Sequence, residues 1–488
     1  MRANDIGSRN GGIVRSASFV VLWLLVCTLF APFAHAARVV PPNIVYVVSD
    51  DQGWKDVGFH GSDVRTPNLD RLAAGGARLE RFYAQPMCTP SRAALLTGRY
   101  PHRYGLQTAV IPSAGTYGLA TDEWLLPQAL KEAGYDTAIV GKWHLGHADR
   151  KYWPQQRGFD YQYGPLLGEI DYFTHSAHGI VDWFRNGEPV VEDGYVTQLL
   201  GDDAVKLIDG HDRGRPLFLY LTFTAPHAPY QAPQVYLDQY ASVADPNRRA
   251  YAAMITAMDH EIGRVVEALR KRRMLDNTII VFQSDNGGPR SAAMTGEVDT
   301  SGGSIPADNG TFRDGKGMLY EGGVRVVALV NWPRHIVPGT VVADPIDVVD
   351  MYPTLAGLAG ASISKSKGLD GLDMWPTLSR GAPSPRTEVV YDIEPFRAAL
   401  SERNWKLVWR VTLPSKLELF DLDADPSETQ NVATDHPDQV ERMRARVELL
   451  ARDAVPPLLL PQIMGVAKPV LFGSVATPQD ETELQLEP

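Results

Sequence analysis

Two apolar segments that lie far apart in the chain share one design. Residues 43–49 and 278–284 are nearly continuous apolar runs, which is typical of strands buried on both faces of a parallel sheet. The first run is followed by Asp50-Asp51 and the second by Asp285-Asn286. In an open α/β sheet, ligands collect beyond the carboxyl ends of the strands. We therefore expect the two strands to lie near each other and to bring four side-chain oxygens together.

This predicted oxygen cluster has two interpretations. Carboxylate and amide oxygens in one place suit a hard cation such as Ca²⁺ or Mg²⁺. Alternatively, Asp50 and Asp285 cap the helices that follow, which suffices for either strand alone. The repetition of the pattern favours a metal. The sequence has no cysteine cluster and few paired histidines, which argues against a thiolate zinc site.

The remaining apolar pattern predicts further elements of an α/β fold. Apolar runs predict strands at 135–140 and 216–223, and an extended segment at 78–85. Helical spacing predicts helices at 66–74, 125–133, 249–273 and 347–358. We expect Asn68 to be the N-cap of the helix near 66. Residues 147–200 have no clear period and predict loops over a cleft that help to choose the substrate; most of their aromatic and histidine side chains are expected to pack.

A change of pattern near residue 360 indicates a second, smaller unit. Residues 360–387 are punctuated by Gly, Pro and Ser, and predict a linker. Short strands are then predicted at 388–391, 398–400, 405–409 and 417–421, followed by an amphipathic helix at 436–452. We predict a catalytic domain at 37–375, an antiparallel-sheet subdomain at 385–455 and a Pro-rich, acidic tail at 456–488.

Length and composition limit the classes of function. A chain of 488 residues can form one large α/β domain and a smaller one, and its 44% hydrophobic content is that of an ordinary globular protein. The net charge of −11 argues against a nucleic-acid partner. The positive partners of any anionic substrate must therefore be concentrated in the cleft.

The N-terminal segment 1–36 has the features of a secretory signal peptide. Three arginines precede an apolar core at 19–33, and Ala34-His35-Ala36 fits a cleavage site. An uncleaved inner-membrane anchor is the less favoured alternative, because the apolar run is short for a membrane span.

Cleavage of the signal peptide removes Cys27 and leaves Cys88 as the single cysteine. An exported chain without a disulfide is expected in a bacterial periplasm or secreted. There, the sequon at Asn309-Gly310-Thr311 would be unused.

Cys88 lies in a segment, 86–99, that predicts a turn followed by a helix. Pro90 and Ser91 suit the first helical positions, and Gly98 can close the helix. Cys88 is then expected just outside a helix N-terminus, where negative charge is stabilised. Arg92 would add a positively charged guanidinium group one turn further along the helix.

This segment resembles the signature of the type I sulfatases, Cys-x-Pro-x-Arg followed by Leu-Thr-Gly-Arg. In that family the cysteine is converted by a formylglycine-generating enzyme to formylglycine (3-oxoalanine), whose hydrated aldehyde is the nucleophile. The strings Gly141-Lys-Trp-His-Leu-Gly146 and Gly315-Lys…Glu-Gly-Gly-Val-Arg325 resemble two further family motifs. The resemblance covers about residues 42–450, and the motifs look most like the arylsulfatase B branch.

The resemblance implies a fold and a set of site residues. The fold is alkaline-phosphatase-like: a large α/β/α sandwich with a mostly parallel, mixed central sheet, plus a small C-terminal α+β subdomain with an antiparallel sheet. The implied ligands of one Ca²⁺ are Asp50, Asp51, Cys88, Asp285 and Asn286. The implied catalytic residues are Cys88, Arg92, Lys142, His144, His227 and Lys316.

The family mechanism assigns a role to each catalytic residue. Lys142 and His144 contact the formylglycine, while His227 and Lys316 contact the sulfate, and either of these two protonates the leaving alcohol. His144 deprotonates the second hydroxyl of the hydrate. Arg92 adds positive charge, whereas Glu321 and Arg325 are expected to form a structural ion pair.

The function implied is hydrolysis of a sulfate monoester on a small molecule, a sulfated sugar or a glycosaminoglycan-type oligosaccharide. One alternative is a phosphonate monoester or phosphodiester hydrolase of the same superfamily, since those substrates are also tetrahedral anions. The other is a protein that binds sulfated glycans without turnover. No nucleic-acid partner and no particular oligomeric state is predicted.

Overall fold

The computed structural model describes residues 41–291, 294, 304–411 and 414–463. The predicted signal peptide lies outside these residues, as does the predicted tail from residue 464 onward. Within the described part of the chain, no helix has the length and apolar character needed to cross a membrane.

A ten-stranded mixed sheet forms the centre of the fold, in the order β14-β2-β13-β11-β1-β10-β4-β5-β8-β9. Its five central strands are parallel and comprise β11 (Thr278–Ser284), β1 (Asn43–Ser49), β10 (Leu217–Thr222), β4 (Asp136–Gly141) and β5 (Tyr161–Gly164). Around them lie β14 (Thr340–Val342), β2 (Ala77–Leu79), β13 (Ala328–Asn331), β8 (Phe184–Arg185) and β9 (Glu188–Pro189). β13 and β8 run antiparallel to the central strands beside them.

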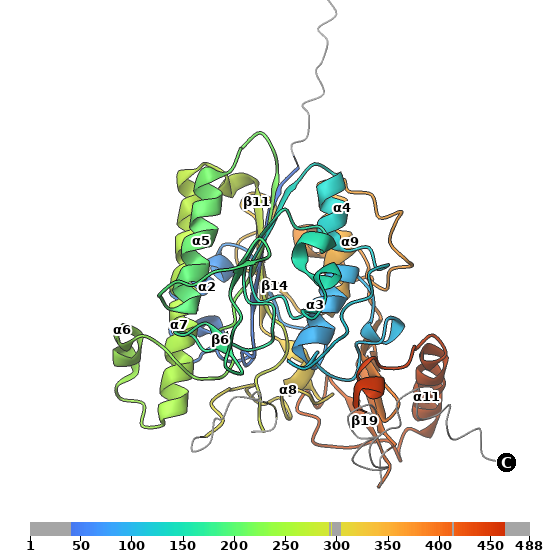
Figure 1. The fold of residues 1–488 in the computed structure, drawn as a ribbon. Coiled ribbons are helices and arrows are strands. Elements are labelled where there is room, and N and C mark those ends of the chain that lie inside the picture. The colour runs from blue at the N-terminus through green and yellow to red at the C-terminus, as the bar shows by residue number, and fades with distance from the viewer. Residues whose placement is uncertain (1–40, 292–293, 295–303, 412–413, 464–488) are drawn as a thin grey trace, which may run out of the picture. The chain divides into compact units, whose positions relative to one another are not determined.

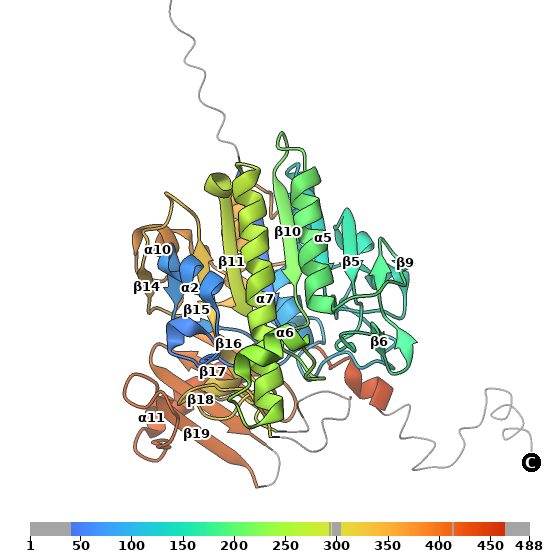
Figure 2. The ribbon, with the colours of Figure 1, turned by 90° about the vertical axis from the view of Figure 1, so that its left-hand side faces the viewer.

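Helices cover both faces of this sheet (Figure 1). One face packs on α2 (Pro67–Ala74), α5 (Val196–Gly210) and α7 (Pro246–Lys271). The other packs on α3 (Cys88–Thr97), α4 (Leu126–Glu132) and α9 (Met351–Ala359). Figure 2 shows α5 and α7 lying in front of β10 and β11. β1 contributes to both cores, since its alternate residues enter opposite layers. This is the α/β/α sandwich that the resemblance implied.

The register of β1 and β11 positions the predicted oxygen cluster. The two strands are parallel neighbours, and Ser49 at the end of β1 pairs with Ser284 at the end of β11. Asp50 and Asp285 therefore leave the sheet at the same level. The prediction that these two strands lie together is confirmed.

Two local predictions about helix starts are wrong. Thr66, not Asn68, is the N-cap of α2, and Pro67 occupies the first helical turn, where its missing N–H costs nothing. Asn68 instead donates its side-chain amide to Asp259 of α7 over 2.8 Å. Helix α3 begins at Cys88 itself, after an extended Met87. Pro90 fits inside this first turn, because the first N–H groups of a helix have no intrahelical partner.

The C-terminal residues form the predicted antiparallel sheet with one helix. Its strands are β16 (Glu388–Ile393), β17 (Arg397–Glu402), β18 (Trp405–Arg410) and β19 (Lys416–Asp421), and α11 (Pro437–Ala451) packs on it. The predicted linker is more ordered than expected. It contains α10 (Trp375–Arg380) and the buried Arg386, whose guanidinium binds the carboxylate of Asp350.

Smaller elements complete the fold. They are a three-stranded sheet of β12 (Arg325–Val326), β3 (Phe82–Tyr83) and β15 (Ile346–Asp347), the hairpin of β6 (Ser176–Ala177) and β7 (Ile180–Val181), and the short helices α6 (Gln234–Leu237) and α8 (Glu321–Val324).

A buried ion cluster joins the C-terminal sheet to the larger sandwich. Lys406 of β18 is fully buried, and its Nζ lies 2.9 Å from Glu321 and 3.0 Å from Glu428. Glu321 also lies 3.5 Å from Arg325, which confirms the predicted structural ion pair. Removing one member of such a cluster leaves an uncompensated buried charge.

We expect Lys406→Ala to lower the free energy of unfolding by about 3–5 kcal/mol, because buried Glu428 loses its cation and buried Glu321 keeps only the more distant Arg325. Urea denaturation measures this change. The matched control is Lys416→Ala, which removes a half-exposed lysine 2.7 Å from Glu418 and is expected to cost at most about 1 kcal/mol. Equal losses in the two variants would contradict the prediction.

Candidate functional site

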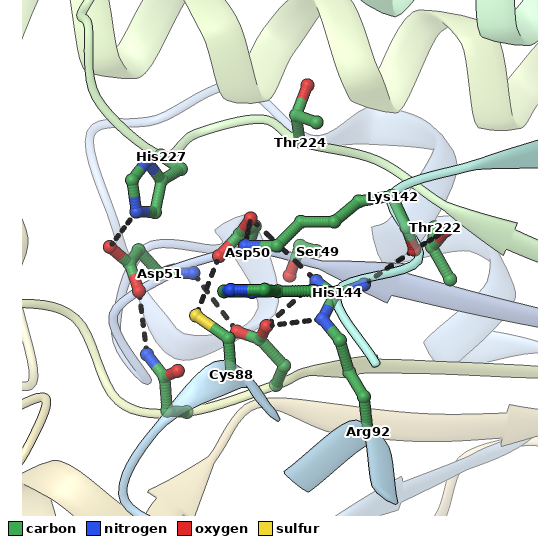
Figure 3. A network of polar contacts seen from close by, with 12 residues as sticks. Ser49, Asp50, Asp51, Cys88, Arg92, Lys142, His144, Thr222, Thr224 and His227 are labelled. Carbon is green, nitrogen blue, oxygen red and sulfur yellow. Dashed lines mark hydrogen bonds and ion pairs between the residues drawn. The ribbon is translucent and has the colours of Figure 1, made fainter. Parts of the chain in front are cut away.

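The predicted site residues converge beyond the carboxyl ends of the central strands, against the N-terminus of α3 (Figure 3). Asp50 and Asp51 follow β1, Asp285 and Asn286 follow β11, and His227 follows β10. Lys142 and His144 follow β4, and Cys88 and Arg92 lie on α3. Lys316 comes from the loop before α8. The structure brings all ten predicted site residues together.

Cys88 is buried at the first position of α3 and faces the acidic cluster. Its Sγ lies 3.5 Å from Oδ1 of Asp50. One ligand-type atom from each of Asp50, Asp51, Cys88 and Asp285 lies within 4.8 Å of the others. Burial, followed by the charge of Asp285, raises the pKa of the Cys88 thiol well above its ordinary value. Burial therefore disfavours the thiolate, which is the nucleophilic form of an unmodified cysteine.

Three buried cations compensate the carboxylates. Nζ of Lys142 lies 2.5 Å from Asp50, and Nζ of Lys316 lies 2.8 Å from Asp51. Arg92 donates from Nε (3.0 Å) and Nη2 (2.8 Å) to one oxygen of Asp285. Of these three cations, Lys316 lines the pocket beside Cys88, whereas Arg92 and Lys142 are buried behind it against the carboxylates.

The arrangement of oxygens fits a hard cation. Nδ2 of Asn286 donates to Asp51 over 2.7 Å, while its buried Oδ1 has no hydrogen-bond partner among the residues that the structure describes. An orphaned amide oxygen beside three carboxylates is a donor set suited to Ca²⁺ or Mg²⁺. Within the described ranges, neither Asp50 nor Asp285 caps a helix, so the capping interpretation is wrong.

His144 is held as a neutral base. Its Nε2 lies 3.1 Å from the carbonyl oxygen of Ile111, which can only accept, so Nε2 carries the proton and Nδ1 is free to take one. Burial, then the charges of Lys142 and Arg92, lower the pKa of His144 well below its ordinary value. His144 has a left-handed backbone (φ 58°), a conformation that costs energy and recurs at functional sites.

His227 lies on the opposite side of the acidic cluster from α3 (Figure 3). Its Nε2 is 3.6 Å from Asp51, and its Nδ1 is 2.6 Å from the carbonyl oxygen of Ala228. Because that carbonyl holds Nδ1, the Nε2 face is the one turned toward the site (Figure 3).

A pocket of about 180 Å³ lies beside Cys88. His144, His227 and Lys316 are among its polar lining residues, and most of its surface is apolar. As predicted, part of segment 147–200 borders this cleft. Of its aromatic and histidine side chains, His178 lines the pocket, whereas Trp153, Tyr163, Tyr172, His175 and Trp183 pack elsewhere. Glu169 also lines the pocket, and no motif in the sequence pointed to it.

Asp182 holds the backbone at residues 166–167, where Leu167 lines the pocket. Its buried carboxylate accepts hydrogen bonds from the backbone N–H groups of Leu166 (3.2 Å) and Leu167 (2.8 Å). Burial raises the pKa of Asp182 to about 6 from an ordinary value of 3.8. The folded state therefore holds this proton more tightly than the unfolded chain does, and stability falls as pH rises through 6.

We expect the free energy of unfolding of the wild type, relative to Asp182→Asn, to fall by roughly 3 kcal/mol between about pH 4 and pH 7. Urea denaturation of both proteins across this range measures the difference. Loss of a hydrogen bond in the variant shifts the curve by a constant and does not change its slope. Asp193→Asn, at an exposed position, controls for removal of a charge. A flat difference between wild type and Asp182→Asn would contradict the prediction.

The sequon at Asn309 has a structural role. The Asn309 side chain is fully buried, accepts from the N–H of Gly288 over 3.0 Å, and donates to the carbonyl oxygens of Gly288 and Asp314, both over 2.9 Å. It thereby ties the segment after β11 to the loop that carries Lys316.

Comparisons with known proteins agree with the motifs. The family model described as Sulfatase matches residues 42–361, and one described as the C-terminal part of N-sulphoglucosamine sulphohydrolase matches residues 309–452. Arylsulfatase J of Mus musculus is 36% identical over 480 residues, covering 87% of this chain and 78% of its own length. N-acetylgalactosamine-6-sulfatase of Homo sapiens is 34% identical over 414 residues, covering 80% and 76%. The crystal structure of Ps i-CgsB in complex with k-i-k-neocarrahexaose superposes with a TM-score of 0.78 at 35% identity, covering 86% of this chain and 94% of that one.

Proposed function

This chain belongs to the sulfatase family and is a sulfuric ester hydrolase, and we propose that its substrate is a sulfate ester carried by a sugar. The names of two similar proteins support a sugar as the carrier of the sulfate ester. One is named for a sulfated N-acetylgalactosamine, and the other was crystallised with a neocarrahexaose. The observation that carries the proposal is a buried Cys88 surrounded by three carboxylates, three cations and two histidines.

The nucleophile in this proposal is formylglycine formed from Cys88. Its hydrated aldehyde supplies one hydroxyl for attack on sulfur and a second hydroxyl for release of the product. The burial of Cys88 supports this assignment, because burial raises the pKa of the thiol and disfavours the thiolate that an unmodified cysteine would need for attack. A sulfated cysteine would also have no second hydroxyl to drive the release.

One Ca²⁺ completes the proposed site. Asp50, Asp51, Asp285 and Asn286, together with residue 88, would hold it. The ion would neutralise sulfate oxygens and lower the pKa of the attacking hydroxyl.

The remaining residues would stabilise negative charge in the transition state and transfer protons. Lys142, Lys316 and Arg92 place positive charge where the sulfate gains negative charge in the transition state. Nδ1 of His144 accepts the proton of the second hydroxyl, a role that its free lone pair supports. His227 or Lys316 donates a proton to the leaving alcohol.

The proposal also covers where the protein acts and which branch of the family it belongs to. Residues 1–36 support export, to a bacterial periplasm or outside the cell, after maturation by a formylglycine-generating enzyme. The three signature strings support a place near the arylsulfatase B branch.

The proposal is tested with nitrophenyl sulfate, its phosphate and phosphonate analogues, and a panel of monosulfated sugars. We expect sulfate release from a sugar, with kcat/KM for the aryl sulfate at least about 100-fold above that for the phosphonate. A preference for the phosphonate would favour the phosphonate monoester hydrolase. Tight binding of sulfated sugars without sulfate release would favour a binding protein.

A further inference from the structure

One wall of the pocket is built directly against His144. The N–H groups of Trp143 and His144 donate to the carbonyl oxygens of Pro165 and Leu166, each over 3.1 Å. A Cβ atom at Gly168 would lie 2.3 Å from Cε1 of His144, so the backbone at Gly168 touches the imidazole. Glu169 is the next residue. Its position is therefore tied to the proposed base.

A second segment brings His178 to the same wall. His178 lies in the turn between β6 and β7 with a left-handed backbone (φ 51°). Nε2 of the nearby His175 lies 3.0 Å from the carbonyl oxygen of Gly194, and its ring stacks on Trp183. With this support, Nε2 of His178 lies 3.1 Å from Oε1 of Glu169.

The chemistry of the wall favours an uncharged polar group. Apolar atoms form most of the pocket surface, and in such pockets a few placed polar groups orient the ligand. Among the lining residues that the structure describes, Lys316 is the only lysine or arginine, and its ammonium is bonded to Asp51. A second sulfate at this wall would meet the Glu169 carboxylate, and like charges brought together disfavour binding.

We infer that Glu169 and His178 are a specificity-determining pair, which binds a hydroxyl of the sugar ring beside the scissile sulfate and disfavours a second sulfate there. The inference rests on the proposed function. The Glu169 carboxylate accepts from the hydroxyl, and the His178 imidazole, with a third of its side chain exposed, provides the second polar contact. The pair is thus expected to choose among sulfated sugars without taking part in the bond cleavage.

The test compares three substrates in Glu169→Gln and His178→Gln. They are nitrophenyl sulfate, the monosulfated sugar that the wild type hydrolyses fastest, and the same sugar with a second sulfate on the neighbouring carbon. We expect Glu169→Gln to raise the ratio of kcat/KM for the disulfated over the monosulfated sugar by about tenfold or more, since the repulsion is removed. Both variants should lower kcat/KM for the monosulfated sugar relative to nitrophenyl sulfate by about tenfold, mainly through KM.

Glu188→Gln and His335→Gln are the matched controls, because both residues are exposed and lie outside the pocket lining. Melting temperatures establish that each variant folds. Should Glu169→Gln fail to fold, the more exposed His178→Gln carries the test through the ratio of sugar to aryl sulfate. Ratios within twofold of the wild type in the folded variants would overturn the inference. A wild type that hydrolyses neither the aryl sulfate nor any sulfated sugar would instead overturn the proposed function.

Discussion

Replacement of Cys88 with alanine is expected to reduce the hydrolysis of sulfate esters by about 10⁴-fold or more, since the group that attacks sulfur is lost. The effect on the fold should be small. Alanine suits the first turn of α3, and the hydrogen bond that the thiol makes to Asp50 is long, at 3.5 Å. Initial rates with nitrophenyl sulfate measure the loss, and thermal denaturation measures the fold.

Mass spectrometry of the peptide that contains residue 88 provides the decisive control. Active wild-type protein should carry an aldehyde at this position. Wild-type protein produced without a maturation enzyme should keep the thiol, fold normally and be as inactive as the alanine variant. A fully active preparation in which residue 88 is entirely thiol would rule out the proposed nucleophile.

The second large effect is expected at the oxygen cluster. Asp285→Asn keeps the shape of the side chain but removes one of three carboxylate charges, and it weakens the two hydrogen bonds from Arg92. We expect kcat/KM to fall by on the order of 100- to 1,000-fold. Removal of the ion from the wild type by a chelator should have an effect at least as large, and added Ca²⁺ should restore activity.

Calcium binding can be measured independently of activity. For the wild type, Ca²⁺ at 100 times its Kd should add about 2.7 kcal/mol to the free energy of unfolding, and Asp285→Asn should lose most of this gain. Asp259→Asn is the matched control, because Asp259 is a buried aspartate that binds Asn68 and is not part of the oxygen cluster. A wild type whose stability and activity do not respond to Ca²⁺ or to a chelator would exclude the proposed ion.

The sequence predicted the part of the molecule in which short-range patterns decide the structure. Continuous apolar runs identify β1 and β11 because both faces of these strands are buried, and their shared endings place Asp50 and Asp285 at one edge. The three signature strings then identified Cys88, Lys142 and Lys316. In each case, the functional side chain lies within a few residues of the end of a strand or the start of a helix.

Long-range contacts explain what the sequence did not reveal. Asn68 could have capped α2, but Asp259, distant in sequence, binds its side chain instead. Glu169 and His178 lie in irregular segments, where no period predicts which side chains face a cleft. Lys406 is buried because two glutamates from other elements surround it. Propensity and spacing contain no information about such tertiary partners.

The burial of Asn309 bears on the choice of an expression host. In a eukaryotic secretory pathway, the sequon would be recognised on the nascent chain, before the Asn309 side chain is enclosed. A glycan attached there could not fit where the amide binds Gly288 and Asp314, so the modified fraction would fail to fold. Thr311 is exposed, and Thr311→Ala would abolish recognition while keeping the asparagine that the structure needs.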